Sequence, residues 1–459
     1  MEYGQFDLFH STETPVREIA KAVYPFSFSP KPEEIRRPQE ADYRNADGGF
    51  DYEAYDRDYE KWRQWRESRW ELQDFPGAAE VRERPKVTAK ETAKLAPFFR
   101  KSAARFLQGD ENRVYAPMNI YMALAMLSGV TAGNSRKQIL NLLGAKTPAA
   151  LAKQANRFWN ALCANDSLST VLLGSSLWLN EKIRFNADTL KQLSETFYAS
   201  FYAGEMGSPA FDAALQTWLN EQTRGLLSKQ VNDVELSSAT LLALATTVYF
   251  KSNWESQFEE GDTMTRDFYA ESGKRKAFFM RQTYAGNYYT GFDFSAVCKE
   301  LQNGEMWLIL PSFDPPADLL ARGEVMDFLC SPQKYVTSTN VDIELSLPKF
   351  DVSTDLDLIG GLEALGVTDV FDSAVSDFSP MTGRTQDIAI TKAQHAARVR
   401  IDEKGCEAAA FTLMEVEITG FPPPPLPRIK FTLNRPFLFA VTVDNLPLFV
   451  GVVQEPLNA

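Results

Sequence analysis

The sequence predicts an α+β fold, in which helices and strands are segregated along the chain. From residue 88 onward, apolar residues recur at helical spacing through the first half, and runs typical of strands fill the second half. We find no internal repeat with a period of 20–50 residues. This order favours an α+β architecture over a doubly wound α/β fold.

Helical patterns come first along the predicted domain. Residues 91–108 place apolar side chains on one helix face, residues 120–130 are nearly all apolar, and residues 135–144 end at a glycine. Two more helices are expected at 147–163, which begins with Thr-Pro, and at 211–227.

Strand patterns dominate the rest of the chain. Residues 169–180 and 239–254 are long apolar runs, and residues 436–454 contain two apolar strands joined by a turn at 444–447. Apolar runs without polar alternation indicate strands that are buried on both faces.

The first 87 residues differ from the rest, so we predict an N-terminal extension at 1–87 and one domain at 88–459. The extension holds 19 acidic and 14 basic residues, which is −5 of the net charge of −13. Residues 40–60 contain eight acids and four tyrosines, and residues 61–70 are basic with three tryptophans. We expect a partly disordered or loosely docked arm, part of which binds the domain or a partner.

Composition excludes several classes of function. An acidic chain with a pI near 4.9 is a poor partner for nucleic acid or an anionic membrane. The sequence has no apolar run of 18 residues, and residues 1–7 do not resemble a signal peptide. With only two histidines, His10 and His395, we predict neither a metal site nor a cofactor.

Catalytic motifs for nucleophilic, nucleotide-binding or metal-dependent chemistry do not occur, so we do not expect an enzyme. The spacing of Cys406 and His395 does not indicate a catalytic pair. The cysteines are widely spaced, which indicates free thiols. They are Cys163, Cys298, Cys330 and Cys406.

Residues 401–427 (IDEKGCEAAAFTLMEVEITGFPPPPLP) combine a charged turn, an alanine run, an alternating stretch and a proline block. Read at period two from Cys406, one face is small or apolar and the other carries three glutamates. The first face is Cys406, Ala408, Ala410, Thr412, Met414, Val416 and Ile418, and the second is Glu407, Ala409, Phe411, Leu413, Glu415, Glu417 and Thr419. The prolines cannot continue a central strand, so an exposed extended segment should follow.

The stretch IDEKGCEAAAFT closely resembles the hinge of the serpin family, which usually has a D-E-K-G-T-E-A-A-A run. Further stretches are similar to family motifs and follow the family order. They are APMNIYMALAMLSGVTAGNSRKQIL, LNEQTRG, TTVYFKSNWESQF, LSLPKF, DFSPMTG, ITKAQHAARVRIDEKG, FTLNRPFLFAV and PLFVGVVQEP. The resemblance covers residues 88–456.

The resemblance implies a metastable serpin fold with three β-sheets, about nine helices and an exposed reactive-centre loop at about 405–427. It implies a suicide-substrate inhibitor: a protease attacks the loop, forms an acyl-enzyme and is trapped when the loop inserts into the large sheet. We expect a monomer that forms a 1:1 covalent complex with its target protease. The small inward face favours this function, and the alternative is a non-inhibitory serpin that acts as a binding or chaperone-like protein.

Family spacing makes Glu403 the seventeenth residue before the cleaved bond. The reactive bond then joins Thr419 and Gly420, with Glu417 and Ile418 in the neighbouring subsites. The small Thr419 favours an elastase-like or subtilisin-like serine protease as the target, and Ile418 also suits papain-like cysteine proteases.

The resemblance also implies three groups of site residues. The hinge contains Glu403, Gly405, Cys406, Glu407, Ala408, Ala409 and Ala410. The breach at the top of the sheet contains Trp254, Lys349 and Glu403, the last two as an ion pair. The shutter contains Asn112, Ala116, Asn119, Thr246 and His395, with a neutral His395 bonded to Asn119 or Thr246.

Four of these residues depart from the family pattern. Ala116 and Asn119 stand where two serines are usual, Thr246 where asparagine is usual, and Cys406 where threonine is usual. Cys406 is expected to serve as a small apolar substitute, and oxidation of its thiol as a brake on insertion is the alternative.

Partners other than a protease find less support. A glycosaminoglycan is not expected, because the candidate helix at 147–163 has only Lys153 and Arg157 as basic residues. The arm at 40–70 is a candidate for contact with an exosite of the protease. Family analogy favours an extracellular or cell-envelope location and leaves a cytoplasmic one open.

Overall fold

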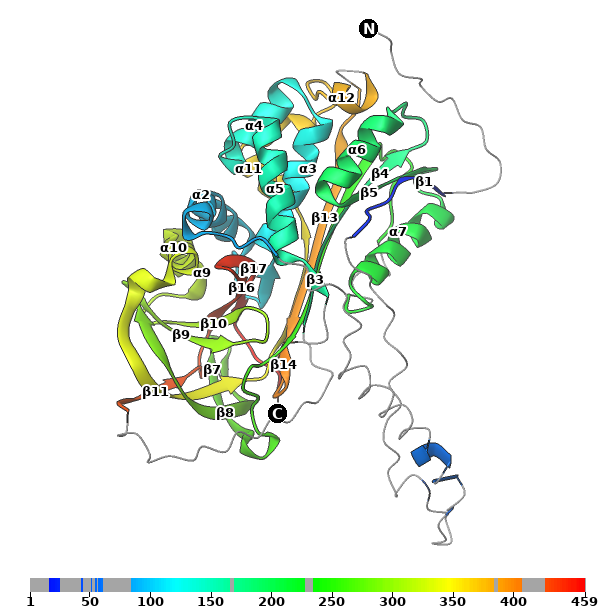
Figure 1. Cartoon of the computed structure of the whole chain (residues 1–459). Helices are drawn as coiled ribbons and strands as arrows, with labels where there is room; N and C mark the ends of the chain where they lie inside the picture. The colour runs from blue at the N-terminus through cyan, green and yellow to red at the C-terminus, as the bar shows by residue number, and fades with distance from the viewer. Residues whose placement is uncertain are drawn as a thin grey trace. The chain divides into compact units, whose positions relative to one another are not determined.

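The computed structural model describes residues 16–24, 43, 51, 54–55, 57–60, 84–165, 169–227, 234–383, 387–406 and 426–458. The chain divides into two compact units (Figure 1). One contains residues up to Val23 and from Pro85 onward, and the other contains Tyr24–Arg84. In the described ranges, no helix is long and apolar enough to cross a membrane.

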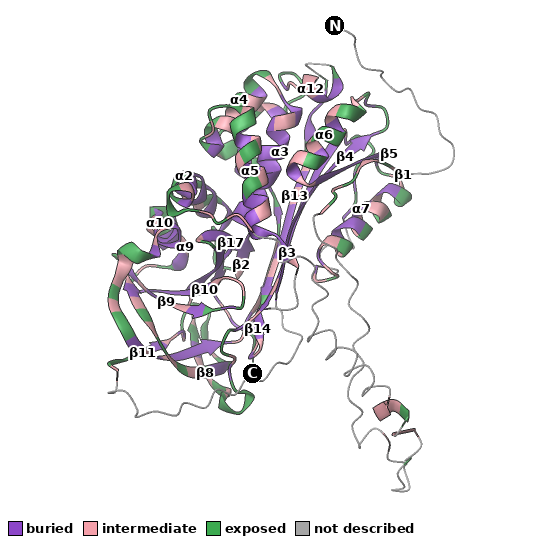
Figure 2. Cartoon of the chain, in the orientation of Figure 1, coloured by how far each residue is buried: buried purple, intermediate pink, exposed green. Residues whose placement is uncertain are grey.

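Eight described strands form one large sheet. Its main path is β1 (Val16–Ala20), β5 (Ala199–Gly204), β4 (Ser169–Asn180), β6 (Leu242–Asn253), β13 (Ile390–Arg400) and β12 (Asp351–Asp357). Two short strands, β3 (Ala164–Asn165) and β14 (Gly405–Cys406), pair with β4 and β6. β6 runs parallel to β13 and antiparallel to β4, which is buried throughout (Figure 2).

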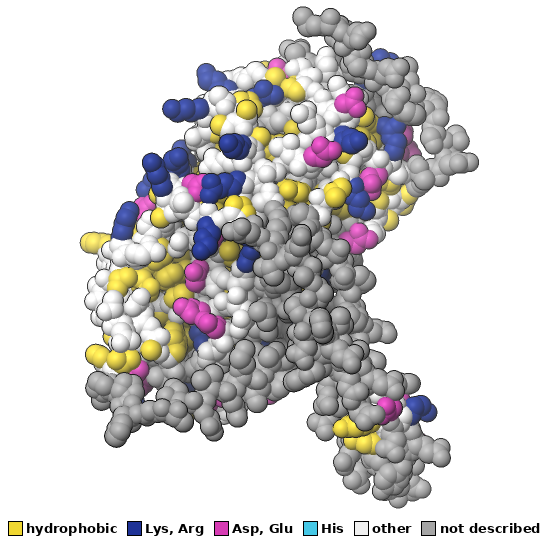
Figure 3. Space-filling view, viewed as in Figure 1, with side chains coloured by type: hydrophobic (Ala, Val, Ile, Leu, Met, Phe, Trp, Pro, Cys, Tyr) yellow, Lys and Arg dark blue, Asp and Glu magenta, His cyan; other side chains and the backbone are white. Residues whose placement is uncertain are grey.

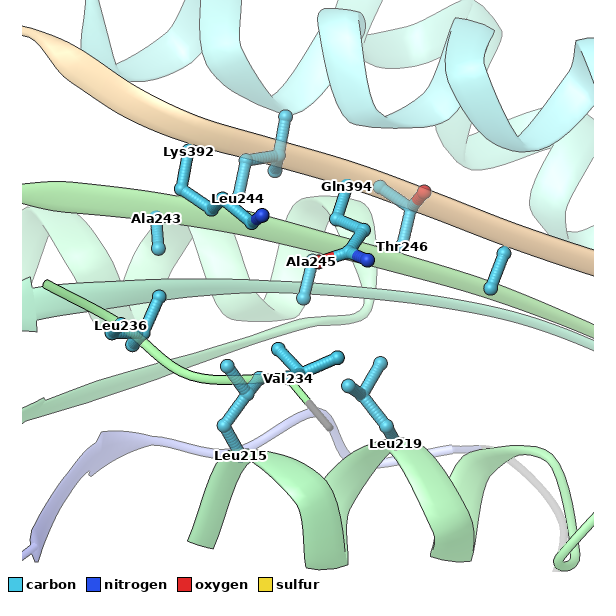
Figure 4. A pocket seen from close by; sticks show the side chains of 11 residues that line it. Leu215, Leu219, Val234, Leu236, Ala243, Leu244, Ala245, Thr246, Lys392 and Gln394 are labelled. Atoms are coloured by element: carbon cyan, nitrogen blue, oxygen red, sulfur yellow. The ribbon is translucent and has the colours of Figure 1, made fainter. Parts of the chain in front are cut away.

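Helices cover both faces of the large sheet. α7 (Pro209–Gln222) turns Leu215 and Leu219 toward one face (Figure 4). α3 (Pro117–Val130) lies at the other face, where the backbone N–H of its N-cap residue, Ala116, donates to His395 of β13. Nearly all of α3 is buried, so it needs no polar face.

The side chains of β6 alternate between these two faces, as in any strand. Ala243 and Ala245 belong to the apolar cluster that contains Leu215 and Leu219 of α7. Phe250 points to the other side, where its ring contacts Phe449 of β17 (Leu446–Val453). Odd-numbered residues of β6 therefore face α7, and even-numbered residues face the core.

The remaining longer helices surround the first half of the domain. They are α2 (Ala89–Phe106), α4 (Gly133–Leu143), α5 (Pro148–Leu162) and α6 (Ala187–Phe197). Thr147, Asn186 and Ser208 each accept a backbone N–H at the start of α5, α6 and α7. Proline follows the cap in α5 and α7, where its missing N–H costs nothing.

A second sheet contains nine described strands. Its order is β15 (Arg428–Thr432), β11 (Val336–Pro348), β8 (Gly273–Thr290), β9 (Phe294–Glu300), β10 (Glu305–Pro311), β16 (Phe437–Val443), β17 and β2 (Arg113–Tyr115), with β7 (Met264–Ala270) paired to β8. β8 is long enough to pair with three strands. Its first part pairs with β7, the rest pairs with β11, and its last residues also pair with β9. The second and third sheets expected from the resemblance are therefore continuous through β8.

Short helices complete the described part of the domain. They are η2 (Glu260–Asp262), α9 (Pro316–Arg322), α10 (Glu324–Cys330), η3 (Pro332–Tyr335), α11 (Ile359–Ala364), η4 (Asp369–Phe371) and α12 (Ser379–Thr382). The α+β fold predicted from the sequence is confirmed, and the five predicted helices are all present. α6 and β5 had no counterpart among the predicted elements.

β1 also had no counterpart, because residues 1–87 were predicted as a partly disordered or loosely docked arm. β1 pairs antiparallel with β5, from Val16 opposite Gly204 to Ala20 opposite Phe201, with a bulge before Ala20. Beyond the strand, the backbone N–H of Ala22 donates to Ser200 Oγ at 3.1 Å. This N-terminal segment therefore adds an edge strand to the large sheet.

The second unit, Tyr24–Arg84, is described at only a few residues. Residues 54–55 and 57–60 are helical. Tyr43 Oη donates to Asp58 Oδ2 at 3.1 Å, and its ring meets the ring of Tyr55 edge-on. Tyrosines and acids of the 40–60 stretch thus contact one another within this unit.

Candidate functional site

A tight turn connects the end of β13 to β14. The backbone N–H of Asp402 donates to the carbonyl of Gly405 at 3.0 Å. The Asp402 carboxylate accepts the backbone N–H groups of Lys404 and Gly405 at 2.9 and 3.3 Å. An aspartate that bonds its own turn favours this reversal, so the chain leaves β13 and immediately turns back beside it.

After the turn, β14 enters the large sheet between β13 and β6. Cys406 lies opposite Ser252 of β6 in an antiparallel ladder and opposite Ile401 in an isolated bridge. Gly405 lies opposite Asn253, and a Cβ built on it would come within 2.4 Å of the Ser252 carbonyl oxygen. Glycine at 405 is therefore required by close backbone approach, and the buried Cys406 already occupies the end of a new strand position.

Lys349 and Glu403, which the sequence analysis predicts as the breach ion pair, lie together at this turn. Lys349 Nζ lies 2.6 Å from Glu403 Oε1, which also accepts a hydrogen bond from Thr263 Oγ1 at 2.7 Å. Burial alone would raise the pKa of the Glu403 carboxyl, but the hydrogen bonds from Lys349 and Thr263 hold that pKa below its usual value. Glu403 is therefore charged and paired at neutral pH.

Trp254, the third breach residue, fixes the turn from the β6 side. Its indole N–H donates to the carbonyl of Asp402 at 2.8 Å, and its backbone N–H donates to the carbonyl of Lys404 at 3.0 Å. The backbone N–H of Phe258 donates to the carbonyl of Glu403, and the rings of Trp254 and Phe258 meet edge-on. The turn is thus held by side chains and backbone together.

The shutter residue His395 is fully buried and bonded through both ring nitrogens. Nε2 accepts the backbone N–H of Ala116 at 3.1 Å, so the ring proton is on Nδ1, which lies 3.0 Å from Thr246 Oγ1. Burial lowers the pKa of His395 to about 4. The ring is therefore neutral at pH 7, and of the two partners considered from the sequence it contacts Thr246.

Asn119 and Asn112 occupy different surroundings from the ones expected. Asn119 is fully buried, and neither of its amide atoms has a hydrogen-bond partner among the described residues. Asn112 bonds the chain beyond β17: its Nδ2 donates to the Glu455 carbonyl at 2.6 Å, and its Oδ1 accepts the Gln454 and Glu455 N–H groups. Neither asparagine contacts His395 through a hydrogen bond.

The seam between β6 and β13 runs from the strands around His395 toward β14. The two strands pair from Ile390 opposite Leu242 to Ala396 opposite Thr247, where the described ladder ends. Five residues farther along β6, at Ser252, the partner is β14 instead of β13. β14 is thus paired with β6 just beyond the end of this seam.

Part of the predicted site lies outside the described residues. This applies to the hinge residues Glu407, Ala408, Ala409 and Ala410, and to Glu417, Ile418, Thr419 and Gly420. Conversely, sequence reasoning missed two residues that hold the hinge. Asp402 could have been suspected as an acid three residues before a glycine, but no local signal identifies Thr263.

The other cysteines are separate from this site. Cys163 and Cys330 are buried and Cys298 is half-buried, and burial raises the pKa of the Cys298 and Cys330 thiols. Within the described ranges, no group of three or more His, Cys, Asp or Glu side chains is arranged to hold a metal ion.

The sequence and the fold are similar to those of known proteins. The family model Serpin (serine protease inhibitor) matches residues 96–456. Alpha-1-antiproteinase S of Cavia porcellus is 29% identical over 365 residues, covering 75% of this chain and 85% of that protein. Serpin B6 of Macaca fascicularis is 28% identical over 373 residues, covering 75% and 94%.

Solved structures share the fold. The thermophilic serpin tengpin in the native state superposes with a TM-score of 0.72 at 22% identity, covering 81% of this chain and 96% of that one. A complex of thyroxine-binding globulin with thyroxine gives a TM-score of 0.68 at 20% identity, covering 80% and 99%. Since the family model alone spans more than three quarters of the sequence, the chain belongs to the serpin family.

Proposed function

We propose that this serpin is a suicide-substrate inhibitor that traps an endopeptidase as a covalent acyl-enzyme. The observation that carries the proposal is the position of β14. Cys406 already pairs with β6 at the end of the β6–β13 seam. The segment that follows it therefore starts at the place where a further strand would enter the sheet.

The register of β14 supports insertion of that segment. If the antiparallel pairing of Cys406 with Ser252 continues residue by residue, even-numbered loop residues lie opposite even-numbered residues of β6, on the core face. These are the small or apolar residues from Ala408 to Ile418. The core face of the new strand would bury no charged side chain, and the strand would gain backbone hydrogen bonds on both sides.

Cleavage at the Thr419–Gly420 bond would release this strand. The 15 residues 405–419, fully extended, span roughly 50 Å. A protease that is acylated at Thr419 would be carried about that distance and distorted before hydrolysis of the ester. Thr419 favours an elastase-like or subtilisin-like target, and Ile418 also suits a papain-like cysteine protease.

The breach and shutter residues would control the insertion. We assign the Lys349–Glu403 pair and Trp254 to holding the turn before cleavage, because all three bond within or beside it. We assign His395 to the shutter as a neutral latch, since it joins the start of α3 to Thr246 of β6 across the seam. None of these side chains has to act as a catalyst.

Incubation with a panel of proteases tests the proposal. We expect a complex that survives denaturing electrophoresis, and mass spectrometry of the released C-terminal peptide should place the cleaved bond at Thr419–Gly420. Two matched variants sharpen the test. Ala410→Glu puts a charge on the core face and should convert the inhibitor into a substrate, whereas Ala409→Glu, on the outer face, should still inhibit.

Two outcomes would contradict the proposal. If the loop is only nicked and nicking leaves thermal stability unchanged, the chain is a non-inhibitory serpin, and a binding or chaperone-like role takes the place of inhibition. If both alanine variants behave alike, the register extrapolated from β14 is wrong even if a covalent complex forms.

A further inference from the structure

A small cavity lies between α7 and the seam of β6 and β13 (Figure 4). Its volume is about 20 Å³, which is room for about one water molecule. Apolar side chains from α7 and the chain after it form one wall, and the seam forms the other. The lining residues that the argument uses are Leu215, Leu219, Ala243, Ala245, Lys392 and Gln394.

The sheet wall of this cavity combines small side chains with polar groups that lack an ion-pair or hydrogen-bond partner among the described residues. Ala243 and Ala245 provide only methyl groups. Lys392 is half-buried, and its ammonium group forms no ion pair within the part of the chain that the structure describes. Gln394 donates Nε2 to Asp355 Oδ2 at 2.5 Å, but its Oε1 is buried and accepts no hydrogen bond from the described residues.

The register of β14 places particular loop residues over this wall. Continuing the antiparallel pairing from Cys406 opposite Ser252 brings Leu413 opposite Ala245 and Glu415 opposite Ala243. Both are odd-numbered positions, which face α7. On the other side of the seam, β13 pairs Gln394 with Ala245 and Lys392 with Ala243, so the inserted strand would set Leu413 beside Gln394 and Glu415 beside Lys392.

The chain outside the described residues is long enough to make these contacts. It begins directly after Cys406, within the seam, and runs for 19 residues to residue 425. Leu413 lies seven residues beyond Cys406, and Ala245 lies seven residues before Ser252. If residues 407–413 extend β14 as a strand, they rise by the same distance per residue as β6, so Leu413 would reach the same level of the sheet as Ala245.

We infer that the cavity beneath α7 is a docking site for the outer face of the reactive loop, where Leu413 fills the cavity and Glu415 pairs with Lys392. The inference rests on the proposed function, because it applies to the inserted state. Insertion of one strand moves β6 and β13 apart by about 4.8 Å, which enlarges the cavity toward the size of a leucine side chain. The wall of alanines leaves that space free, and α7 shields the Lys392–Glu415 pair from solvent.

The charge pair gives the sharpest test. We compare the wild-type chain with Glu415→Lys, Lys392→Glu and the double exchange, each before and after cleavage of the loop by a protease that escapes trapping. Each single exchange should lower the thermal midpoint of the cleaved form by several degrees, and the double exchange should restore most of the loss. The midpoint of the uncleaved form should not change with Glu415→Lys, because the pair forms only on insertion.

Two further variants serve as controls. Glu407→Lys changes an acid on the same outer face, but the register places Glu407 opposite Lys251, eight positions away from Ala243. Combining it with Lys392→Glu should give no rescue. Leu413→Ala should lower the midpoint of the cleaved form and leave the uncleaved form unchanged.

The outcomes separate this inference from the proposed function. If cleavage raises the midpoint of the wild type but the charge exchange gives no rescue, or Leu413→Ala has no effect on the cleaved form, only the docking site is wrong. If cleavage does not raise the wild-type midpoint at all, the loop does not insert, and both the docking site and the inhibitory mechanism are overturned.

Discussion

His395 shows how one buried residue links pH to the stability of the large sheet. Burial lowers its pKa to about 4, whereas an exposed histidine titrates near 6.5. Between these values the unfolded chain binds a proton that the native protein does not, so stability falls as pH drops from about 6.5 toward 4. The loss from this group should reach about 2 kcal/mol at pH 5.

Unfolding at pH 7 and pH 5 measures this effect, with His395→Gln as the control. The variant cannot titrate in this range, so its unfolding midpoint should fall less between the two pH values than that of the wild type. Equal falls in both proteins would mean that other groups cause the pH dependence.

Asn119 presents the opposite case, a polar residue whose burial is not compensated. Both amide atoms are buried without a partner among the described residues, and such a group costs on the order of 1–3 kcal/mol. Asn119→Leu keeps a similar shape and removes the polar atoms, so it should stabilise the native form by about 1–2 kcal/mol. Asn119→Asp, which buries a charge at the same place, should destabilise it.

The midpoint of the first unfolding transition in urea checks both Asn119 variants. A lower midpoint for Asn119→Leu would show that the amide has a favourable partner in solution. A higher midpoint for Asn119→Leu would identify the buried amide as one source of instability in the native form.

At the scale of elements, β1 forms the edge of the large sheet beside β5. Val16 packs against the cluster beneath α7, and the Arg17 guanidinium lies 5.2 Å from the centre of the Phe185 ring. Glu18 lies just before the bulge of β1, and its side chain is exposed to solvent. β1 covers the edge of β5 and ties it to α7, so its loss should loosen β5 first.

Val16→Asp tests the role of β1, with Glu18→Ala as the matched control. The aspartate would bury a charge against the cluster, so β1 should detach and the amides of β5 should exchange hydrogen faster. The exposed Glu18 position should tolerate alanine without faster exchange. Unchanged exchange in Val16→Asp would mean that β5 does not depend on β1.

Some elements depend on residues that are near them in the sequence, and others depend on residues that are far away. Only the first kind could be predicted from the sequence. The buried helix at 117–130 and the strand at 242–253 follow from neighbouring residues, so periodicity predicted them, at 120–130 and 239–254. β1 is only five residues long and pairs with residues about 180 positions away, which no local pattern can show. The partners of Glu403 divide in the same way: the family motif indicated Lys349, but only the fold brings Thr263 to the carboxylate.

At the scale of the whole molecule, the net charge of −13 is unevenly distributed. The eight acids and two arginines of residues 40–60 give −6. On the face of the domain shown in Figure 3, by contrast, lysine and arginine side chains gather over α4 and α5. The charge of residues 40–60 leads us to predict that this stretch attracts a protease with a basic surface beside its active site.

Neutralising the arm tests this long-range effect. With the eight acids of residues 40–60 changed to amides, association with a protease that has a basic surface patch should slow several-fold at low ionic strength. At about 1 M salt, where charges are screened within about 3 Å, the variant and wild-type rates should converge. A protease without such a patch should associate with both at the same rate. Equal rates and equal salt dependence with the basic protease would assign the arm a role other than capture. The stoichiometry of inhibition should stay unchanged in every case, because it depends on loop insertion.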